Sequence, residues 1–285
     1  MATRHSSSKD SDPEAFLTTE LFQEPANFRP PSPEPTIIDH LTPSGKSLKI
    51  RLVGGHPLWG HVLYPASVLL ARYIENNSAS LFPENQSIKV LELGAGGGLP
   101  GLTCVLSGAA LVVSTDFPDP DLIHNLEWNA NTNLTDSLRS RLIVQGLKWG
   151  AKVDHLFSRI SPISSNDVPN NKATNSSSPK SGFDLILLSD LVFNHSEHKS
   201  LLATCEECLK PRDPDQDGFT PCLLVFYSHH RPRFAKADDE FIDIARQRGW
   251  MCEKILEDKN AGLAFPEDDG DPIIRGTVHG WSFTR

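Results

Sequence analysis

The chain has 285 residues, of which 38% are hydrophobic, and it carries a formal net charge of −9 at pH 7. This length and apolar content predict a soluble globular protein with one large α/β domain or two small domains, and exclude a chain without a core. The acidic balance argues against DNA or RNA as the main ligand, because phosphate binding requires a basic face. A basic partner is favoured instead.

The sequence carries no sign of a membrane or secretory protein. No apolar run approaches the ~18 residues that a membrane-spanning helix needs, and residues 1–12 lack the apolar stretch of a secretory signal. The five cysteines are an odd number and are scattered, so a disulfide framework is not expected. These features favour a reducing compartment, the cytosol or the nucleus.

Composition divides the chain into three parts. Residues 1–45 are predicted to form a mostly flexible leader, because prolines crowd the stretch from Pro25 to Pro35 and disfavour helix and central strand. Residues 46–285 are predicted to form a single domain. Within it, residues 161–181 are rich in Ser, Asn and Pro, which predicts a disordered surface insertion.

From residue 47 onward, short apolar runs alternate with segments of helical pattern. Strands are predicted at residues 47–53, 88–93, 111–115, 141–145, 183–188, 222–227, 251–256 and 274–283. Helices are predicted at residues 64–74, 99–106, 119–128, 196–209 and 241–247. Such alternation indicates βαβ units around a mostly parallel sheet with helices on both faces. The last two strands have no helix-length segment between them, so an antiparallel pairing is expected there.

The strongest motif is glycine-rich and follows the strand at 88–93, where the sequence reads VLELGAGGGLPG from Val90 to Gly101. Leu99 stands where the dinucleotide fingerprint G-x-G-x-x-G requires its third glycine, so that fingerprint fails. The pattern is instead E-x-G-x-G-x-G, beginning at Glu92. S-adenosylmethionine carries an amino group and a sulfonium but no phosphate, so an acid at the strand end suits it. A methyl-donor site is favoured over a dinucleotide site or a purely structural turn.

Asp116 ends the next apolar run, about 20 residues beyond the glycines, where a carboxylate can accept both hydroxyls of a ribose. The alternative is that it caps the helix after Pro118. Phe117 is placed to lie on one face of an adenine. Trp149 and Trp59 each have two interpretations, as a flat wall beside the ligand or as part of the core packing.

The strand at 183–188 is followed by Ser189 and Asp190. Ligands of open parallel sheets bind beyond the carboxyl ends of the strands, so both residues are expected to line the pocket near the transferable methyl. Asp190 is the candidate catalytic residue, which would hold or deprotonate an amine acceptor. Alternatively it caps the helix that follows.

Further candidate acceptor contacts come from an aromatic rim and from a pair of histidines. Phe193 and Tyr227 are expected to orient the amine beside Asp190. His229 or His230, in the loop after the strand at 222–227, could accept a proton there. Adjacent histidines in a loop are, however, more often solvated.

No metal site is predicted. Residues 213–218 copy the start of an EF-hand loop, but Leu224 occupies the position of the closing glutamate. Cys205 and Cys208 form a C-x-x-C without a second pair at zinc spacing.

Taken together, these segments resemble the seven-stranded (class I) methyltransferases of METTL type, and within them the fungal nicotinamide N-methyltransferase-like proteins that methylate elongation factor 1-alpha. The likeness runs from about residue 48 to the C-terminus and touches residues 21–22. The matching stretches are residues 59–65, 92–101, 115–118, 121–123, 149–150, 189–195 and 227–232.

The resemblance implies a Rossmann-like fold that binds S-adenosyl-L-methionine. It implies donor contacts at Trp59, Gly94, Ala95, Gly96, Asp116, Trp149 and Ser189. It also implies a cytoplasmic enzyme, expected to be a monomer, that methylates the N-terminal α-amine and a neighbouring lysine of elongation factor 1-alpha. Two alternatives stay open: a small-molecule N-methyltransferase acting on nicotinamide or a similar compound, and a non-catalytic adaptor that retains donor binding.

Overall fold

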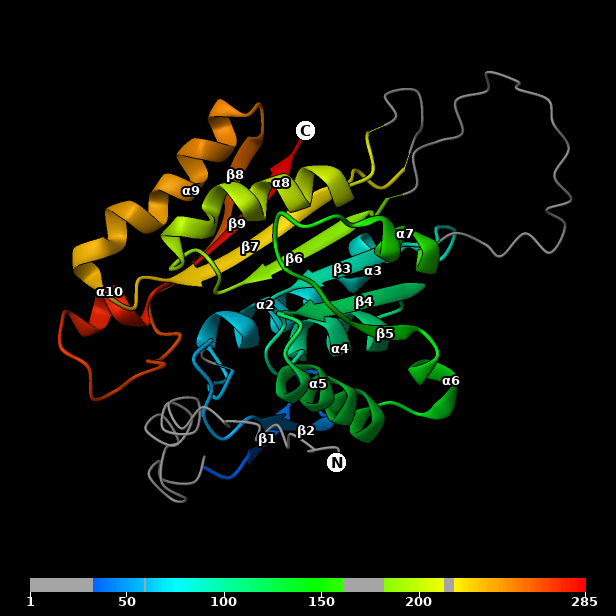
Figure 1. Ribbon diagram of the computed structural model, residues 1–285, viewed down its shortest axis with the longest axis horizontal. Helices are drawn as coiled ribbons and strands as arrows, with labels where there is room; N and C mark the ends of the chain where they lie inside the picture. The colour runs from blue at the N-terminus through cyan, green and yellow to red at the C-terminus, as the bar shows by residue number, and fades with distance from the viewer. Residues whose placement is uncertain (1–32, 59, 161–181, 213–217) are drawn as a thin grey trace, which may run out of the picture. The chain divides into compact units, whose positions relative to one another are not determined.

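A computed structural model of the chain describes residues 33–58, 60–160, 182–212 and 218–285. The compact unit runs from Glu34 to Arg285 (Figure 1). The predicted insertion at 161–181 and most of the predicted leader lie outside the described residues. Within the described residues, no helix combines the length and the apolar character needed to cross a bilayer.

The folded unit begins with a β-hairpin that the composition of the leader did not reveal. Strand β1 (Thr36–Leu41) pairs antiparallel with β2 (Ser47–Leu52). The connecting turn is closed by a hydrogen bond from the Thr42 amide to the Lys46 carbonyl, at 2.9 Å. Because β1 pairs with a neighbouring segment, residues 36–41 belong to the fold although they lie before residue 46.

The remaining strands form one seven-stranded sheet in the order β5-β4-β3-β6-β7-β9-β8. Their bounds are β3 Lys89–Leu93, β4 Leu111–Asp116, β5 Leu142–Gly146, β6 Leu185–Ser189, β7 Cys222–Ser228, β8 Met251–Asp258 and β9 Val278–Thr284. The pairs from β5 to β7 are parallel, and β9 is antiparallel to both β7 and β8. The predicted Rossmann-like fold class is confirmed.

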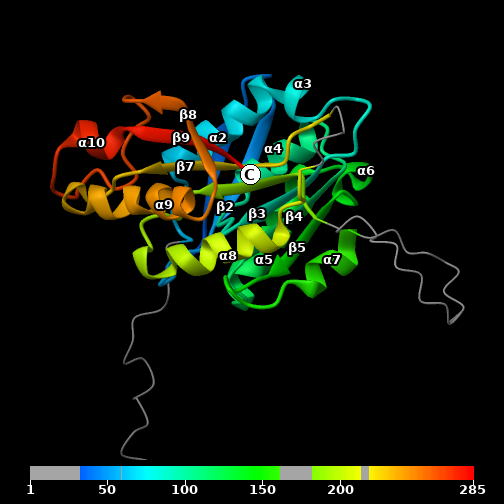
Figure 2. The ribbon, with the colours of Figure 1, turned by 90° about the horizontal axis from the view of Figure 1, so that it is seen from above.

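Helices cover both faces of the sheet. They are α2 Pro65–Asn76, α3 Ser78–Leu81, α4 Leu99–Leu106, α5 Pro120–Asn133, α6 Asp136–Arg139, α7 Asp154–Ile160, α8 His198–Cys208, α9 Ala235–Gln247 and α10 Pro272–Gly276, with 3₁₀ turns η1 His195–Glu197 and η2 Pro232–Phe234. Figure 2 shows α2 and α4 on one side of the sheet and α8 and α9 on the other. Strands β3, β4, β6 and β7 are therefore buried on both sides, which explains why they read as apolar runs.

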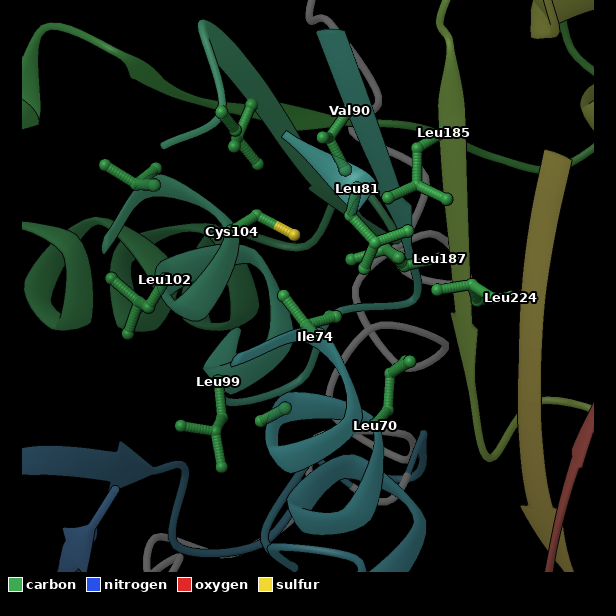
Figure 3. Close-up of a cluster of buried hydrophobic side chains, with 14 of the residues drawn as sticks. Leu70, Ile74, Leu81, Val90, Leu99, Leu102, Cys104, Leu185, Leu187 and Leu224 are labelled. Atoms are coloured by element: carbon green, nitrogen blue, oxygen red, sulfur yellow. The ribbon is translucent and has the colours of Figure 1, made fainter. Parts of the chain in front are cut away.

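Strand alternation divides the core into two clusters. In β6, Leu185 and Leu187 pack with α2 and α4, whereas Ile186 and Leu188 pack with α7, α8 and α9. Figure 3 shows part of the first cluster, with Leu185 and Leu187 of β6 and Leu70 and Ile74 of α2 among the labelled side chains. These four side chains of β6 are 0% exposed, so the strand that ends at the candidate site is fixed from both faces.

Two predicted elements begin at clearly different residues from the observed ones. The strand expected at 274–283 begins only at Val278, because α10 precedes it. That short helix starts with Pro272, and the side chain of Asp271 caps it by accepting a hydrogen bond from the Ile273 amide at 2.8 Å. The helix expected at 241–247 begins earlier, at Ala235.

Candidate functional site

A cavity of about 440 Å³ lies at the carboxyl ends of β3, β4 and β6. The strand order reverses between β3 and β6, and such switch points leave a crevice for ligands in open α/β sheets. The segment before α2 supplies the opposite wall, including Leu63 and Tyr64. The size is within the range of ligand pockets, roughly 300–1,000 Å³.

The glycine-rich segment forms the floor of this cavity. Gly94 and Gly96 have φ of 58° and 55°, a region that other residues adopt only at a cost of ~1–2 kcal/mol. A Cβ at Gly94 would lie 2.6 Å from Cδ2 of Leu191, whereas one at Gly96 would meet nothing within 4 Å and would project into free space. Ala95 also lines the cavity. The Gly96 backbone is thus open to a ligand.

Glu92 lies beneath the glycine-rich segment and does not line the cavity, in contrast to the expectation of a donor contact. It is 1% exposed, and its carboxylate accepts hydrogen bonds from the Gly101 amide (3.0 Å) and the Ser114 hydroxyl (2.5 Å). Alternation along β3 turns this side chain toward α4, away from the strand end. Burial raises the pKa of Glu92 to about 7 against the effect of the two hydrogen bonds, with a smaller contribution from the Asp116 charge.

Asp116 lines the cavity and connects β4 to the glycine-rich segment. Its Oδ2 accepts a hydrogen bond from the Gly96 amide and its Oδ1 from the Phe117 amide, each at 2.7 Å. Each carboxylate oxygen can accept a further hydrogen bond. Burial raises the pKa of Asp116, and the two amide hydrogen bonds oppose this rise. The capping alternative is wrong, because α5 is capped by Asp119.

Aromatic and apolar side chains surround the polar floor. Trp149 and Phe117 both line the cavity, and Phe117 is 42% exposed although nothing in its chemistry favours water. Trp59 lies outside the described residues, while its neighbours Leu58 and Gly60 line the cavity. Flat apolar walls beside a carboxylate that can hold a ribose suit an adenosine group.

The polar groups of the cavity fit S-adenosylmethionine. Ser189 lines the cavity, and its Oγ is buried without a hydrogen-bond partner within the described part of the chain, a vacancy that a polar ligand group can fill. Among the described lining residues, carboxylates come from Asp116, Asp190 and Glu197, against the single basic side chain of Lys148. Such a lining favours a ligand with cationic groups and disfavours one with phosphates.

Asp190 lies in the cavity wall in an unusual backbone conformation. Its φ is 57°, the only positive value among the described residues other than glycine. The side chain is buried, its Oδ1 lies 3.4 Å from the Ser228 amide, and its Oδ2 lies 2.8 Å from Nε2 of His230. The carboxylate thus combines a cavity position with two partners from the end of β7.

The three predicted acceptor contacts have different positions. Phe193 lines the cavity, but Tyr227 and His229 do not. Strand alternation turns Tyr227 toward α9, where its hydroxyl donates to Asp239 at 2.7 Å, and Nδ1 of His229 lies 2.8 Å from Asp238. The expectation that these two side chains contact the acceptor in this cavity is therefore corrected by the structure.

His230, the other histidine named in the sequence analysis, contacts Asp190 at 2.8 Å but does not itself line the cavity. Two residues that do line it, Tyr64 and Glu197, were not predicted as site residues. Tyr64 precedes the proline that opens α2, and Glu197 lies in a 3₁₀ turn. Neither carries a local motif, so only the tertiary fold identifies them.

Comparison with known proteins finds relatives in sequence and similar solved structures. A family model described as lysine methyltransferase matches residues 44–172. Protein N-terminal and lysine N-methyltransferase efm7 of Schizosaccharomyces pombe is 40% identical over 279 residues, which cover 96% of this chain and 97% of that protein. The protein of the same name from Cryptococcus neoformans is 38% identical and covers 98% of this chain and 91% of its own length. A solved structure, P. horikoshii TYW2 in complex with MeSAdo, has 17% identity and a TM-score of 0.48, with coverage of 89% of this chain and 72% of that one.

Proposed function

This chain belongs to the family of protein N-terminal and lysine N-methyltransferases, and from that premise we propose that it transfers methyl groups from S-adenosylmethionine to the N-terminal α-amine and a neighbouring lysine of elongation factor 1-alpha. The observation that carries the proposal is the cavity at the switch point, where Asp116, Ser189 and the open Gly96 backbone fit the donor and Asp190 is available to an amine.

The donor-binding residues act by position. Bound S-adenosylmethionine supplies an electrophilic methyl group on a sulfonium. Asp116 would accept hydrogen bonds from the ribose hydroxyls, and Phe117 and Trp149 would lie beside the adenine. The Ser189 hydroxyl and the Gly96 backbone would bind the polar end of the donor. Glu92 supports this floor from below through the Gly101 amide.

The acceptor must arrive as a neutral amine, because its lone pair forms the new C–N bond as the S–C bond breaks. An α-amine has an unperturbed pKa near ~8 and a lysine one near ~10.4, so the α-amine loses its proton more readily. Asp190 accepts a hydrogen bond from the amine and orients it, and Phe193 limits its movement. Water takes the proton. Alignment contributes most of the rate, since well-oriented groups reach effective molarities of ~10⁵ M or more.

Charge supports a basic protein partner rather than a nucleic acid. The net charge is −9, and the acidic lining of the cavity suits an amino terminus followed by a lysine. We place the enzyme in the cytoplasm as a monomer; its five cysteines are all free thiols, as a reducing compartment requires. The choice of elongation factor 1-alpha follows from the family resemblance.

The test is transfer of radiolabelled methyl to a matched cytosolic lysate resolved by size, with the wild type compared with Asp116→Ala. A labelled band of elongation-factor size that is lost in the variant, and that is absent when the factor's N-terminus and neighbouring lysine are blocked, supports the proposal. Label confined to the small-molecule fraction would favour a nicotinamide-type enzyme. Donor binding without any label would favour an adaptor.

A further inference from the structure

His230 lies two residues beyond β7, immediately behind the cavity wall. Its ring packs against Tyr64, at 5.4 Å between ring centroids, and against Phe265, at 5.7 Å; these two rings also contact each other, at 6.0 Å. Its side chain is 11% exposed, and Nε2 lies 2.8 Å from Oδ2 of Asp190, whose side chain is 2% exposed. His230 does not line the cavity, whereas Asp190 and Tyr64 do. The imidazole therefore acts on the cavity indirectly, through its contacts with the Asp190 carboxylate and the Tyr64 ring.

Asp190 has a backbone conformation that other contacts must stabilise, and the contact with His230 is one of them. A φ of 57° is unfavourable for an aspartate and persists only where the surroundings impose it. Its amide donates to the Phe226 carbonyl at 2.7 Å, which ties the turn to β7, but the contact from the Ser228 amide to Oδ1 is long at 3.4 Å. The His230 contact is thus the shortest that the side chain makes among the described residues, and it sets the direction of the carboxylate.

We propose that His230 is a positioning residue for methyl transfer, which donates a hydrogen bond from Nε2 to Oδ2 of Asp190 and thereby fixes the orientation in which the carboxylate meets the acceptor amine. This inference rests on the proposed function, since it gives Asp190 an amine to hold. An ionised carboxylate only accepts, so the proton of the pair is on the imidazole. Such charge-assisted bonds are short and strong.

The charged groups around His230 support this assignment. They come from three elements: Asp190 after β6, Asp238 of α9, and Arg275 of α10, whose Nε donates to the His230 carbonyl at 3.2 Å. Burial lowers the pKa of His230, but the two carboxylates raise it, and the net pKa lies above the ordinary 6.5. A donor to a buried carboxylate is expected to shift in this direction.

The orientation of Asp190 matters because the acceptor has to approach the methyl group in line. If the carboxylate could rotate freely, it could bind the amine in orientations that direct the amine's lone pair away from the methyl group. Misplacement of a reacting group by about 1 Å can cost roughly 10²-fold in rate. Loss of His230 should therefore lower kcat while donor affinity stays unchanged, because no donor contact passes through this residue.

The first measurement tests the pairing without any activity. In ¹⁵N-labelled full-length protein, the imidazole titration and tautomer of His230 are followed by NMR in the wild type and in Asp190→Asn, with the signal assigned by its absence from His230→Gln. We expect a protonated Nε2 in the neutral form and a lower pKa in Asp190→Asn. An unprotonated Nε2, or a titration that does not change in the variant, would overturn the inference.

The second measurement is methyl transfer to purified elongation factor 1-alpha. His230→Phe keeps a ring against Tyr64 and Phe265 but has no hydrogen-bond donor. His230→Gln places an amide N–H near the position of Nε2. His124→Gln, at an exposed site, is the matched control. For His230→Phe we expect kcat to fall about 10²-fold with unchanged donor affinity by calorimetry, and for His230→Gln a partial recovery. Equal losses in both variants, or wild-type kcat in His230→Phe, would contradict the positioning role. If the wild type itself transfers no methyl, the proposed function fails, while the NMR result still decides the pairing.

Discussion

Replacement of Glu92 by glutamine should make the protein more stable above neutral pH and have a much smaller effect, below about 1 kcal/mol, at pH 5. Glu92 is fully enclosed between β3, α4 and β4, and burial raises its pKa from 4.5 to about 7. A glutamine is close in shape to the protonated acid. Its Oε1 can accept from the Gly101 amide and its Nε2 can donate to the Ser114 oxygen, so both groups that contact Glu92 keep a hydrogen bond to the side chain at this position, although the Ser114 hydroxyl changes from donor to acceptor.

The sign and size follow from the linkage between protonation and folding. An acid whose folded pKa is raised stabilises the protein below its unfolded pKa, and that contribution is lost as the pH rises through the folded pKa. For Glu92 the loss extends from about pH 4.5 to about pH 7. The difference of about 2.5 between the two values, at about 1.36 kcal/mol for each pKa unit, gives about 3 kcal/mol. The unfolding free energy of Glu92→Gln should therefore exceed that of the wild type by about 3 kcal/mol at pH 8.

The assay is urea denaturation followed by tryptophan fluorescence at pH 5, 6, 7 and 8. The quantity of interest is the difference in unfolding free energy between variant and wild type, because contributions of other titrating groups largely cancel in it. Glu84→Gln, at an exposed position, is the matched control and should show a difference near zero throughout. A difference for Glu92→Gln that is constant with pH, or that favours the wild type at pH 8, would refute the reasoning.

Three further outcomes are expected. Gly96→Val should weaken donor binding by calorimetry at least about tenfold, because its side chain would enter the free space of the cavity and φ of 55° disfavours valine; unchanged affinity would exclude this floor as the donor site. Leu187→Ala should lower the unfolding free energy by about 2–5 kcal/mol in denaturation experiments, because it opens a hole in a fully buried strand. Arg275→Met should speed amide hydrogen exchange in residues 261–271, since the buried guanidinium donates to the carbonyls of Phe265 and Asp268; unchanged exchange would show that the segment is held by other contacts.

Local patterns in the sequence were sufficient for the class of fold, and they singled out several residues that the structure brings together around one cavity, namely Gly94, Ala95, Gly96, Asp116, Trp149 and Ser189. The apolar runs alternate with helices because both faces of the central strands are buried, and that alternation is visible without coordinates. The glycines after β3 and the acid after β4 were likewise readable, because a sharp turn and a ribose acceptor each require particular residue types at the end of a strand.

The arrangement of side chains around Asp190 could not be predicted from the sequence, because the position of each of these residues depends on contacts with segments distant in the chain. Adjacent histidines look alike in sequence, yet His229 pairs with Asp238 of α9 while His230 pairs with Asp190 across 40 residues. Likewise, Glu92 is buried beneath the glycine-rich segment because α4 packs over its face of β3. Tyr64 contacts His230 because the packing of α2 on the sheet places Tyr64 beside the end of β7. Periodicity determines which residues face a core; the packing of separate elements determines which polar side chains meet.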